Sequence, residues 1–279
     1  MGFPLFYPQQ QKAVEKYGSK YGTASKYMAY NGPFTQTGWT GSNLSWKLKK
    51  NPNYWDKNAV KLDSVNYSVQ KTPSTAYNLY QSNKIDAVLL DSQQTKNLKN
   101  QNGYTVRPTA STFYLQYNQK NKDLQNANLR RAISLAINRK ALGSALGGSN
   151  KPANSFTAQG LTKVEDTDFA AKTADTDYSK YDPAEAKKLF KKALQELGKK
   201  NVSVSILSDD TDAGQKTTET LQSQIEENLK GIKVSVANVP FKTRLSRSTN
   251  GNFDMVVTGW SADFADPISF DDLMTSKNA

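Results

Sequence analysis

Short apolar runs alternate with amphipathic segments in the C-terminal part of the chain, and this alternation restricts the fold more than any other feature. Strands joined through helices at this spacing form a parallel or mixed sheet with right-handed crossovers. The sequence therefore predicts an α/β unit here. In chain order we expect a strand over 202–207, a helix from about 212 to 229, a strand over 232–239, a short helix over 241–248 and a strand over 253–258.

The N-terminal part is predicted to be richer in strands. Asn31-Gly32-Pro33-Phe34 is a turn that opens a strand, and Gly41-Ser42-Asn43 is a hairpin-like turn before the next. Residues 62–69 alternate apolar and polar side chains, which is typical of a half-buried strand. Further expected elements are a helix over 12–22 ended by a glycine, a helix started by Thr72-Pro73-Ser74 and an apolar strand over 85–90.

The pattern changes near residue 110, where we place the domain boundary. A chain of 279 residues is long enough for about two domains. We expect residues 1–109 to form one and residues 110–279 the other. Early elements of the second part are a strand over 112–117, a helix over 126–143, a polar stretch over about 148–181 and a helix from Asp182-Pro183 to Gly198.

Histidine and cysteine are both absent from the chain. Their absence excludes Cys/His zinc sites, cysteine nucleophiles and every catalytic triad with an imidazole base, and we expect no metal or cofactor. The run Asp209-Asp210-Thr211-Asp212 does not match a calcium loop. Counted from Asp210, Leu221 stands at the twelfth position, where an EF-hand needs a glutamate. A turn in which Asp212 caps the next helix is the better interpretation.

The formal net charge of +12 raises the question of nucleic-acid binding. Only six of the 37 basic residues are arginines, although the guanidinium fork favours base readout and phosphate clamps. The lysines are scattered along most of the chain, with small clusters such as residues 47–50 and 187–188. We therefore expect a solvated basic surface and no nucleic-acid partner.

No apolar run of about 18 residues is present, so the sequence predicts no transmembrane helix. The start, Met1-Gly2-Phe3-Pro4, has no basic region followed by an apolar stretch, as a signal peptide would. We expect the protein either to be cytoplasmic or to have lost its targeting segment.

Five segments carry a likeness to a known family, in the family's order and spacing across nearly the whole chain. They are residues 31–34 (NGPF), 50–55 (KNPNYW), 80–86 (YQSNKID), 130–140 (RRAISLAINRK) and 259–267 (GWSADFADP). With them the chain resembles the substrate-binding proteins of peptide ABC importers, solute-binding protein family 5, most closely the oligopeptide-binding lipoproteins of Gram-positive bacteria. Any one segment alone is weak evidence, whereas five in register are specific.

The resemblance implies an α/β fold of the periplasmic-binding-protein type II kind, with two lobes of mixed β-sheets flanked by helices around a cleft. Residues 1–109 would be part of lobe one and residues 110–279 most of lobe two, with a hinge crossing within Thr109–Tyr117. Family members are longer, so we expect this chain to be a fragment, and Met1-Gly2 to be an addition to the natural sequence.

The same resemblance implies the function. The intact protein would capture oligopeptides by hinge closure and deliver them to the membrane permease subunits of an ABC importer. It would be extracellular and tethered to the outer face of the cell membrane by an anchor segment absent from this chain. We expect a monomer and no enzymatic activity.

Asp263 is the first candidate for ligand binding. It follows a predicted strand, where its carboxylate can pair with the free amino group of a peptide or cap a helix that starts near Asp266-Pro267. The residues alone leave both roles open. The resemblance assigns Asp263 to the peptide amino group, as the aspartate of the motif that begins with Gly259-Trp260.

The resemblance also places the neighbours of Asp263 beside the ligand. Trp260 would form a cleft wall, and the backbone groups of Gly259, Ser261 and Ala262 would pair with the ligand main chain. Main-chain pairing holds a peptide whatever its sequence, so that one protein can bind many peptides.

Phe241 and Phe113 are further candidates, although core packing explains an aromatic residue equally well. The family often has a pocket-lining aromatic at the position of Phe241, and Phe113 lies in the hinge-side strand next to Tyr114. Val257 is a departure, because some relatives carry an arginine there. Recognition of ligand charge is therefore expected to differ in this chain.

Two other functions stay open at the level of the sequence. A glycosidase needs only two carboxylates and aromatic platforms, and Asp263 with Asp266 or Asp271 would be the pair. A carbohydrate-binding or cell-wall-binding module would use the 29 aromatic residues (4 Trp, 14 Tyr and 11 Phe) and the basic surface. The family motifs favour binding without turnover.

Overall fold

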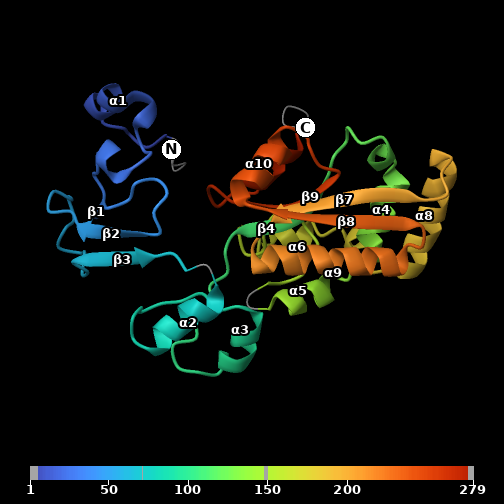
Figure 1. The fold of residues 1–279 in the computed structure, drawn as a ribbon, viewed down its shortest axis with the longest axis horizontal. Coiled ribbons are helices and arrows are strands. Elements are labelled where there is room, and N and C mark those ends of the chain that lie inside the picture. The colour runs from blue at the N-terminus through green and yellow to red at the C-terminus, as the bar shows by residue number, and fades with distance from the viewer. Residues whose placement is uncertain (1–5, 71, 148–149, 276–279) are drawn as a thin grey trace. The chain divides into compact units, whose positions relative to one another are not determined.

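The computed structural model describes residues 6–70, 72–147 and 150–275. The chain divides into two compact units, Met1–Leu90 and Asp91–Ala279, which are described one at a time (Figure 1). The lobe boundary expected near residue 110 falls inside the second unit and stays a prediction.

An antiparallel sheet in the order β1-β2-β3 forms the centre of the first unit. The two predicted turns precede β1 and β2, so both strands are confirmed. Trp46 on β2 faces Tyr67 on β3, and their rings stack with centroids 5.2 Å apart. The strands are β1 (Phe34–Thr37), β2 (Ser45–Lys50) and β3 (Ser64–Ser68).

The helices of the first unit are short. The first, α1 (Gln11–Tyr17), ends at Gly18, whose φ of +50° suits glycine, and not at Gly22 as expected. A second, α2 (Pro73–Gln81), begins after Thr72, whose hydroxyl accepts from the amide of Thr75, so the predicted start is confirmed. Single-turn 3₁₀ segments cover Gly18–Lys20 and Ser25–Tyr27.

The strand predicted over residues 85–90 is wrong. These residues are irregular, and the side chain of Leu89 is 91% exposed. A strand needs a neighbour with which to pair, and within the described residues the three-stranded sheet ends at β3.

A mixed sheet in the order β4-β9-β7-β8 organises the second unit. The three C-terminal strands run parallel, and β4 lies antiparallel to β9. This arrangement confirms the predicted α/β alternation. The strands are β4 (Ser111–Tyr117), β7 (Val202–Asp209), β8 (Ile232–Val239) and β9 (Met255–Ser261).

Helices cover one face of this sheet and enclose the core. Ile133, Phe190 and Ile225, from three different helices, are at most 3% exposed and pack with Ile206 and Met255 of the sheet. Figure 1 shows α9 running along β7 and β8, with α10 on the other side of the sheet. The main helices are α4 (Ala127–Ala136), α8 (Pro183–Leu197), α9 (Asp212–Asn228) and α10 (Phe241–Thr249).

The helix predicted over 126–143 is two helices, α4 and α5 (Arg139–Leu146). The chain leaves the helix at Ile137, and the side chain of Asn138 accepts from the amide of Ala141 at 2.9 Å, which starts α5. Asn138 is thus a second N-cap within one continuous apolar pattern, and the pattern alone does not reveal it. Similarly, Thr211 caps α9 instead of Asp212, which is its first residue.

Short elements complete the second unit. The stretch described from the sequence as polar, about 148–181, contains a small hairpin and two single-turn helices. No helix in the described part of the chain is long and apolar enough to span a bilayer. The remaining elements are α3 (Ser92–Leu98), β5 (Lys163–Val164), β6 (Thr167–Asp168), α6 (Phe169–Lys172), α7 (Thr176–Ser179), α11 (Ile268–Asp271) and the 3₁₀ segments Asp123–Gln125 and Asp272–Met274.

Candidate functional site

The connections of the second sheet reverse direction between β7 and β9. From β7 the chain crosses through α9 to β8 on one side, and from β8 it returns through α10 to β9 on the other. The crossover helices therefore lie on opposite faces (Figure 1). In open α/β sheets ligands bind outside the carboxyl ends of the strands at such a reversal. This edge is the candidate site.

All seven residues predicted to bind ligand lie at or next to this edge of the second unit. Five are consecutive, Gly259 to Ser261 at the end of β9, then Ala262 and Asp263. Phe241 begins α10 directly after β8, and Phe113 lies opposite Gly259 on β4. Their placement together is a property of the fold, and their binding roles stay predictions.

The carboxylate of Asp263 is exposed and makes no hydrogen bond or ion pair with the described residues. Its amide donates to Ser269 Oγ at 2.8 Å, which fixes the backbone at this point. Asp263 does not cap α11: the N-cap position is Pro267, and it is Asp266 whose Oδ1 accepts from the amide of Ile268 at 2.9 Å. Asp263 therefore has no structural use for its charge among these residues.

Trp260 is half-buried and is fixed by its polar edge. Its Nε1 donates to the carbonyl oxygen of Ser269 at 2.6 Å. Phe270, the next residue, is fully buried and contacts Phe156 edge-on with ring centroids 5.9 Å apart. The indole is thus anchored to the backbone beside a buried aromatic residue, and part of its surface remains exposed.

Phe113 is 74% exposed, and its ring lies against the backbone of Gly259. A Cβ at that glycine would stand 2.8 Å from a ring carbon of Phe113. Glycine at this position therefore lets the ring of Phe113 lie directly against the strand backbone, and a larger residue would displace it.

Phe241 is 58% exposed, and the guanidinium carbon of Arg244 lies 5.0 Å from the centre of its ring. Arg244 itself is buried. Its Nε donates to Asp209 Oδ1 at 3.0 Å and its Nη1 to Thr258 Oγ1 at 3.4 Å. Arg244 was not among the residues predicted to bind ligand. The available signal was its type and position, an arginine on a lysine-rich chain, about one helical turn after the candidate Phe241.

Tyr114 lies on β4 opposite Thr258 of β9, and its phenol interacts electrostatically with the guanidinium of Arg244. Burial raises the pKa of Tyr114 above its ordinary value of 10.0, and the charge of Arg244 opposes this rise. The phenol therefore stays protonated at neutral pH and offers a neutral hydroxyl.

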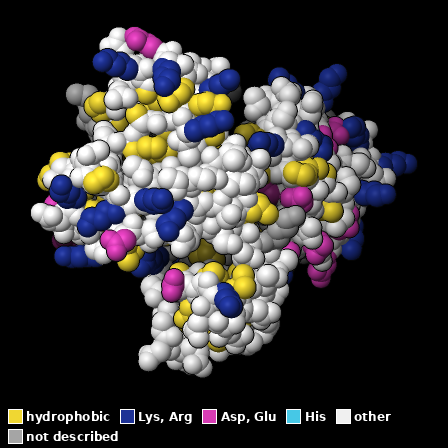
Figure 2. Space-filling view, turned by 60° about the vertical axis from the view of Figure 1, so that its left-hand side comes forward, with side chains coloured by type: hydrophobic (Ala, Val, Ile, Leu, Met, Phe, Trp, Pro, Cys, Tyr) yellow, Lys and Arg dark blue, Asp and Glu magenta, His cyan; other side chains and the backbone are white. Residues whose placement is uncertain are grey.

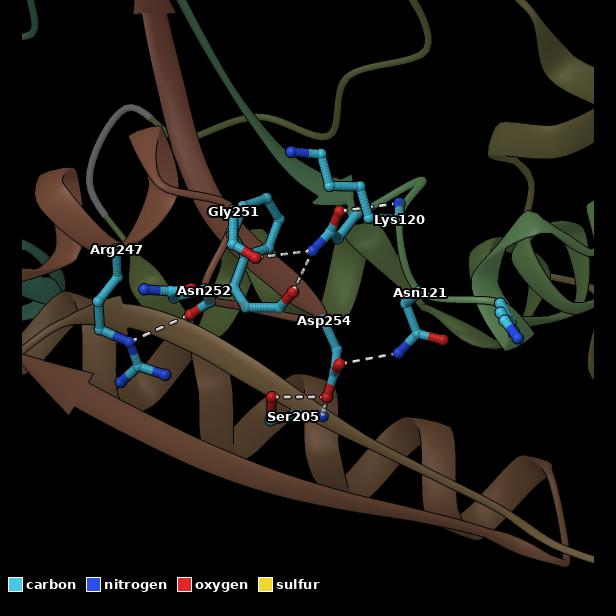
Figure 3. A pocket seen from close by; sticks show the side chains of 10 residues that line it. Lys120, Asn121, Ser205, Arg247, Gly251, Asn252 and Asp254 are labelled. Carbon is cyan, nitrogen blue, oxygen red and sulfur yellow. Dashed lines mark hydrogen bonds between the residues drawn. The ribbon is translucent and has the colours of Figure 1, made fainter.

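A hollow of about 450 Å³ lies around Asp254 (Figure 3). Asp254 precedes β9, whereas the candidate residues lie at or beyond the other end of that strand or beside it. Asp254 Oδ1 accepts from Asn121 Nδ2, and Oδ2 accepts from the amide and hydroxyl of Ser205, all at 2.8 Å. The carboxylate is thus fully used in joining the loop after β4 to β7.

The described residues hold no group of three or more carboxylates placed to bind a metal ion. On the face shown in Figure 2, lysine and arginine side chains are dispersed among uncharged atoms and are not gathered into one patch.

The chain matches one protein family over residues 1–279, the bacterial extracellular solute-binding proteins, family 5 Middle. It is 41% identical over 288 aligned residues to a protein named dipeptide-binding protein of Lactococcus lactis, an alignment that covers 98% of this chain and 52% of the relative. The chain thus spans about half the length of the curated relatives it matches.

Two solved structures are closely similar. Listeria monocytogenes OppA bound to peptide superposes with a TM-score of 0.91 at 37% identity, over 99% of this chain and 55% of that one. The oligopeptide ABC transporter substrate-binding domain of Bacillus anthracis gives 0.89 at 39% identity, over 99% and 54%. The predicted type II α/β fold is confirmed for the part that this chain spans. The chain belongs to family 5 of the bacterial extracellular solute-binding proteins.

Proposed function

We propose that the protein captures oligopeptides outside the cell and delivers them to the permease subunits of an ABC importer. The observation that carries this proposal is the Asp263 carboxylate, which is exposed and has no partner among the described residues, beside the Gly259-Trp260 strand end. The solved relatives are named as peptide-bound or oligopeptide-transporting proteins, which supports the same class of ligand.

The proposed contact chemistry is simple. The ammonium group at the start of a peptide pairs with Asp263, a charged hydrogen bond worth about 1.5–3 kcal/mol when partly desolvated. The following peptide units pair with the main chain near Gly259 and Ser261, as a strand adds to a sheet edge. Phe113 and Phe241 offer exposed rings to the side chains.

The protein is proposed to bind its ligand without turnover. The glycosidase alternative needs two free carboxylates, and those of Asp266 and Asp271 already accept hydrogen bonds, from the amide of Ile268 and the hydroxyl of Thr157. The lipid tether belongs to the same proposal.

Retention of peptides is the direct test. The complete gene product that carries these residues is incubated with a mixed peptide pool, and the molecules that co-purify are identified by mass spectrometry. Retained peptides are expected. Retained sugars, or cleavage of a glycan, would favour the rival functions.

The role of Asp263 is tested with peptides that have free or acetylated amino termini. Asp263→Ala is expected to weaken the free peptides about tenfold or more, since tenfold corresponds to about 1.4 kcal/mol, and the acetylated ones far less. Calorimetry measures both, with Asp166→Ala as a control that removes another exposed carboxylate. Equal losses for the two peptide series would remove Asp263 from this role.

A further inference from the structure

β7 and β9 are neighbours that separate after only two paired positions. They run parallel and pair through Ile206–Met255 and Leu207–Val256 alone, although β9 continues to Ser261. On its other side β9 stays paired with β4 as far as Ser261. Residues 257–261 therefore present one edge of main-chain groups that no strand of the described chain uses.

A side-chain bridge stands where the ladder would have continued. Two positions beyond the last pair, Asp209 would lie opposite Thr258. The guanidinium of Arg244 occupies this place, with Nε 3.0 Å from Asp209 Oδ1 and Nη1 3.4 Å from Thr258 Oγ1. The side chain of Arg244 is only 10% exposed, and Asp209 balances its charge.

We propose that Arg244 is a positioning residue that holds β7 and β9 apart and so keeps the 257–261 edge of β9 available to the main chain of a peptide. This inference rests on the proposed function and deepens it. Closing the ladder would use those amide and carbonyl groups within the protein, and a ligand would find no edge with which to pair.

The chemistry of arginine suits this task. A planar guanidinium offers separate donors, so that one group spans a carboxylate on one strand and a hydroxyl on the other, while its face lies toward Phe241. A lysine ammonium is a single point charge and does not span both in one fixed geometry. Arg244 thereby also fixes a candidate aromatic relative to the strand edge.

The test separates main-chain pairing from general stability. In the complete gene product, calorimetry measures affinity for one peptide and for the same peptide N-methylated at each backbone amide in turn. The wild type is expected to lose about tenfold when a pairing amide is methylated. Arg244→Gln is expected to bind the unmodified peptide about tenfold more weakly and to show little further loss on methylation.

Three further variants sharpen the result. Arg244→Lys is expected to lie between the wild type and Arg244→Gln, and Asp209→Asn, which keeps its shape, to act in the same direction if Arg244→Gln does not fold. Arg247→Gln is the matched control on the same helix, because Arg247 donates to the carbonyl of Asn252 and bridges no strands. It should bind as the wild type does.

The outcomes are distinguishable. An Arg244→Gln variant that keeps the full methylation penalty, or that weakens every peptide by the same factor, would overturn the inference while leaving peptide capture intact. A wild-type protein that retains no peptide would overturn the proposed function itself. Circular dichroism at the assay temperature verifies that each variant is folded.

Discussion

Gly259 is the residue whose replacement is most informative, because the ring of Phe113 occupies the space that a side chain at this position would need. The ring atoms of Phe113 lie 2.8–3.1 Å from where a Cβ would be. Since Phe113 is largely exposed, the ring has solvent space into which it can move.

We therefore predict that Gly259→Ala lowers the free energy of unfolding by only about 1 kcal/mol, at the low end for overpacking. Chemical denaturation measures this loss. Adding Phe113→Ala to the same chain should restore most of it, because the clash partner is gone. An equal loss with and without the ring would show that the backbone, and not Phe113, sets the cost.

For single residues, the sequence predicted where the candidate residues lie in the fold better than which side chains they contact. The motif placed Gly259 through Asp263 together because they are consecutive and follow a strand. Arg244 was missed because its meaning depends on Asp209 and Thr258, which are distant in sequence and approach only when β7 and β9 become neighbours. Pairings of this kind are a property of topology, which a single sequence does not display.

Among the elements, α8 was the best predicted, since each end carries a local signal. Asp182 and Pro183 begin it, and Gly198 ends it with a left-handed φ of +65°. The prediction of a strand over 85–90 was wrong for the opposite reason. An apolar run indicates that the residues tend to be buried, but it does not show which neighbouring strand would pair with them. The break between α4 and α5 was not predicted, because the apolar periodicity continues from one helix into the next.

The N-cap of α8 is a carboxylate, Asp182, so its contribution to stability depends on pH. Asp182 accepts from the amide of Glu185 at 3.0 Å, and this bond, more than the nearby Lys180, holds the pKa of Asp182 below its ordinary value of 3.8. The folded-state pKa is thus lower than the unfolded one. The contribution is present above pH 3.8 and is lost as the pH falls through the lower folded-state value.

We predict that Asp182→Asn keeps most of the stability at pH 7, because asparagine also caps helices, and reduces its loss below about pH 4. Thermal unfolding followed across this pH range is the measurement. Asp177→Asn serves as the control, since Asp177 caps no helix. An unchanged acid slope in Asp182→Asn would contradict the assignment.

Across the whole molecule, burial is unevenly shared between the two units. Of the buried apolar residues in the described chain only Ala13 and Ala24 belong to the first unit, and the rest form the core of the second. All six ion pairs found in the described residues are also in the second unit. Residues 1–90 carry 11 lysines against 4 carboxylates, a net +7, so repulsion adds to thin packing there.

We therefore predict that backbone amides of residues 6–90 exchange with solvent faster than those of β7, β8 and α9. Local openings cost little free energy where few apolar contacts must be broken. Hydrogen exchange followed by mass spectrometry on this 279-residue chain measures the difference. Equal protection in the two units would show that the first is held by contacts other than buried apolar ones.

The separation of β7 from β9 leaves part of a strand edge unpaired, and an unpaired edge carries a risk of aggregation. A row of unsatisfied peptide groups invites any extended segment, including one from a second copy of the same chain, and so seeds aggregation. A cation set inward beside that row is a recognised deterrent to such self-association. A peptide that paired with this edge of β9 would add a strand to the sheet, so the peptide-bound protein would have one strand more in that sheet than the ligand-free protein.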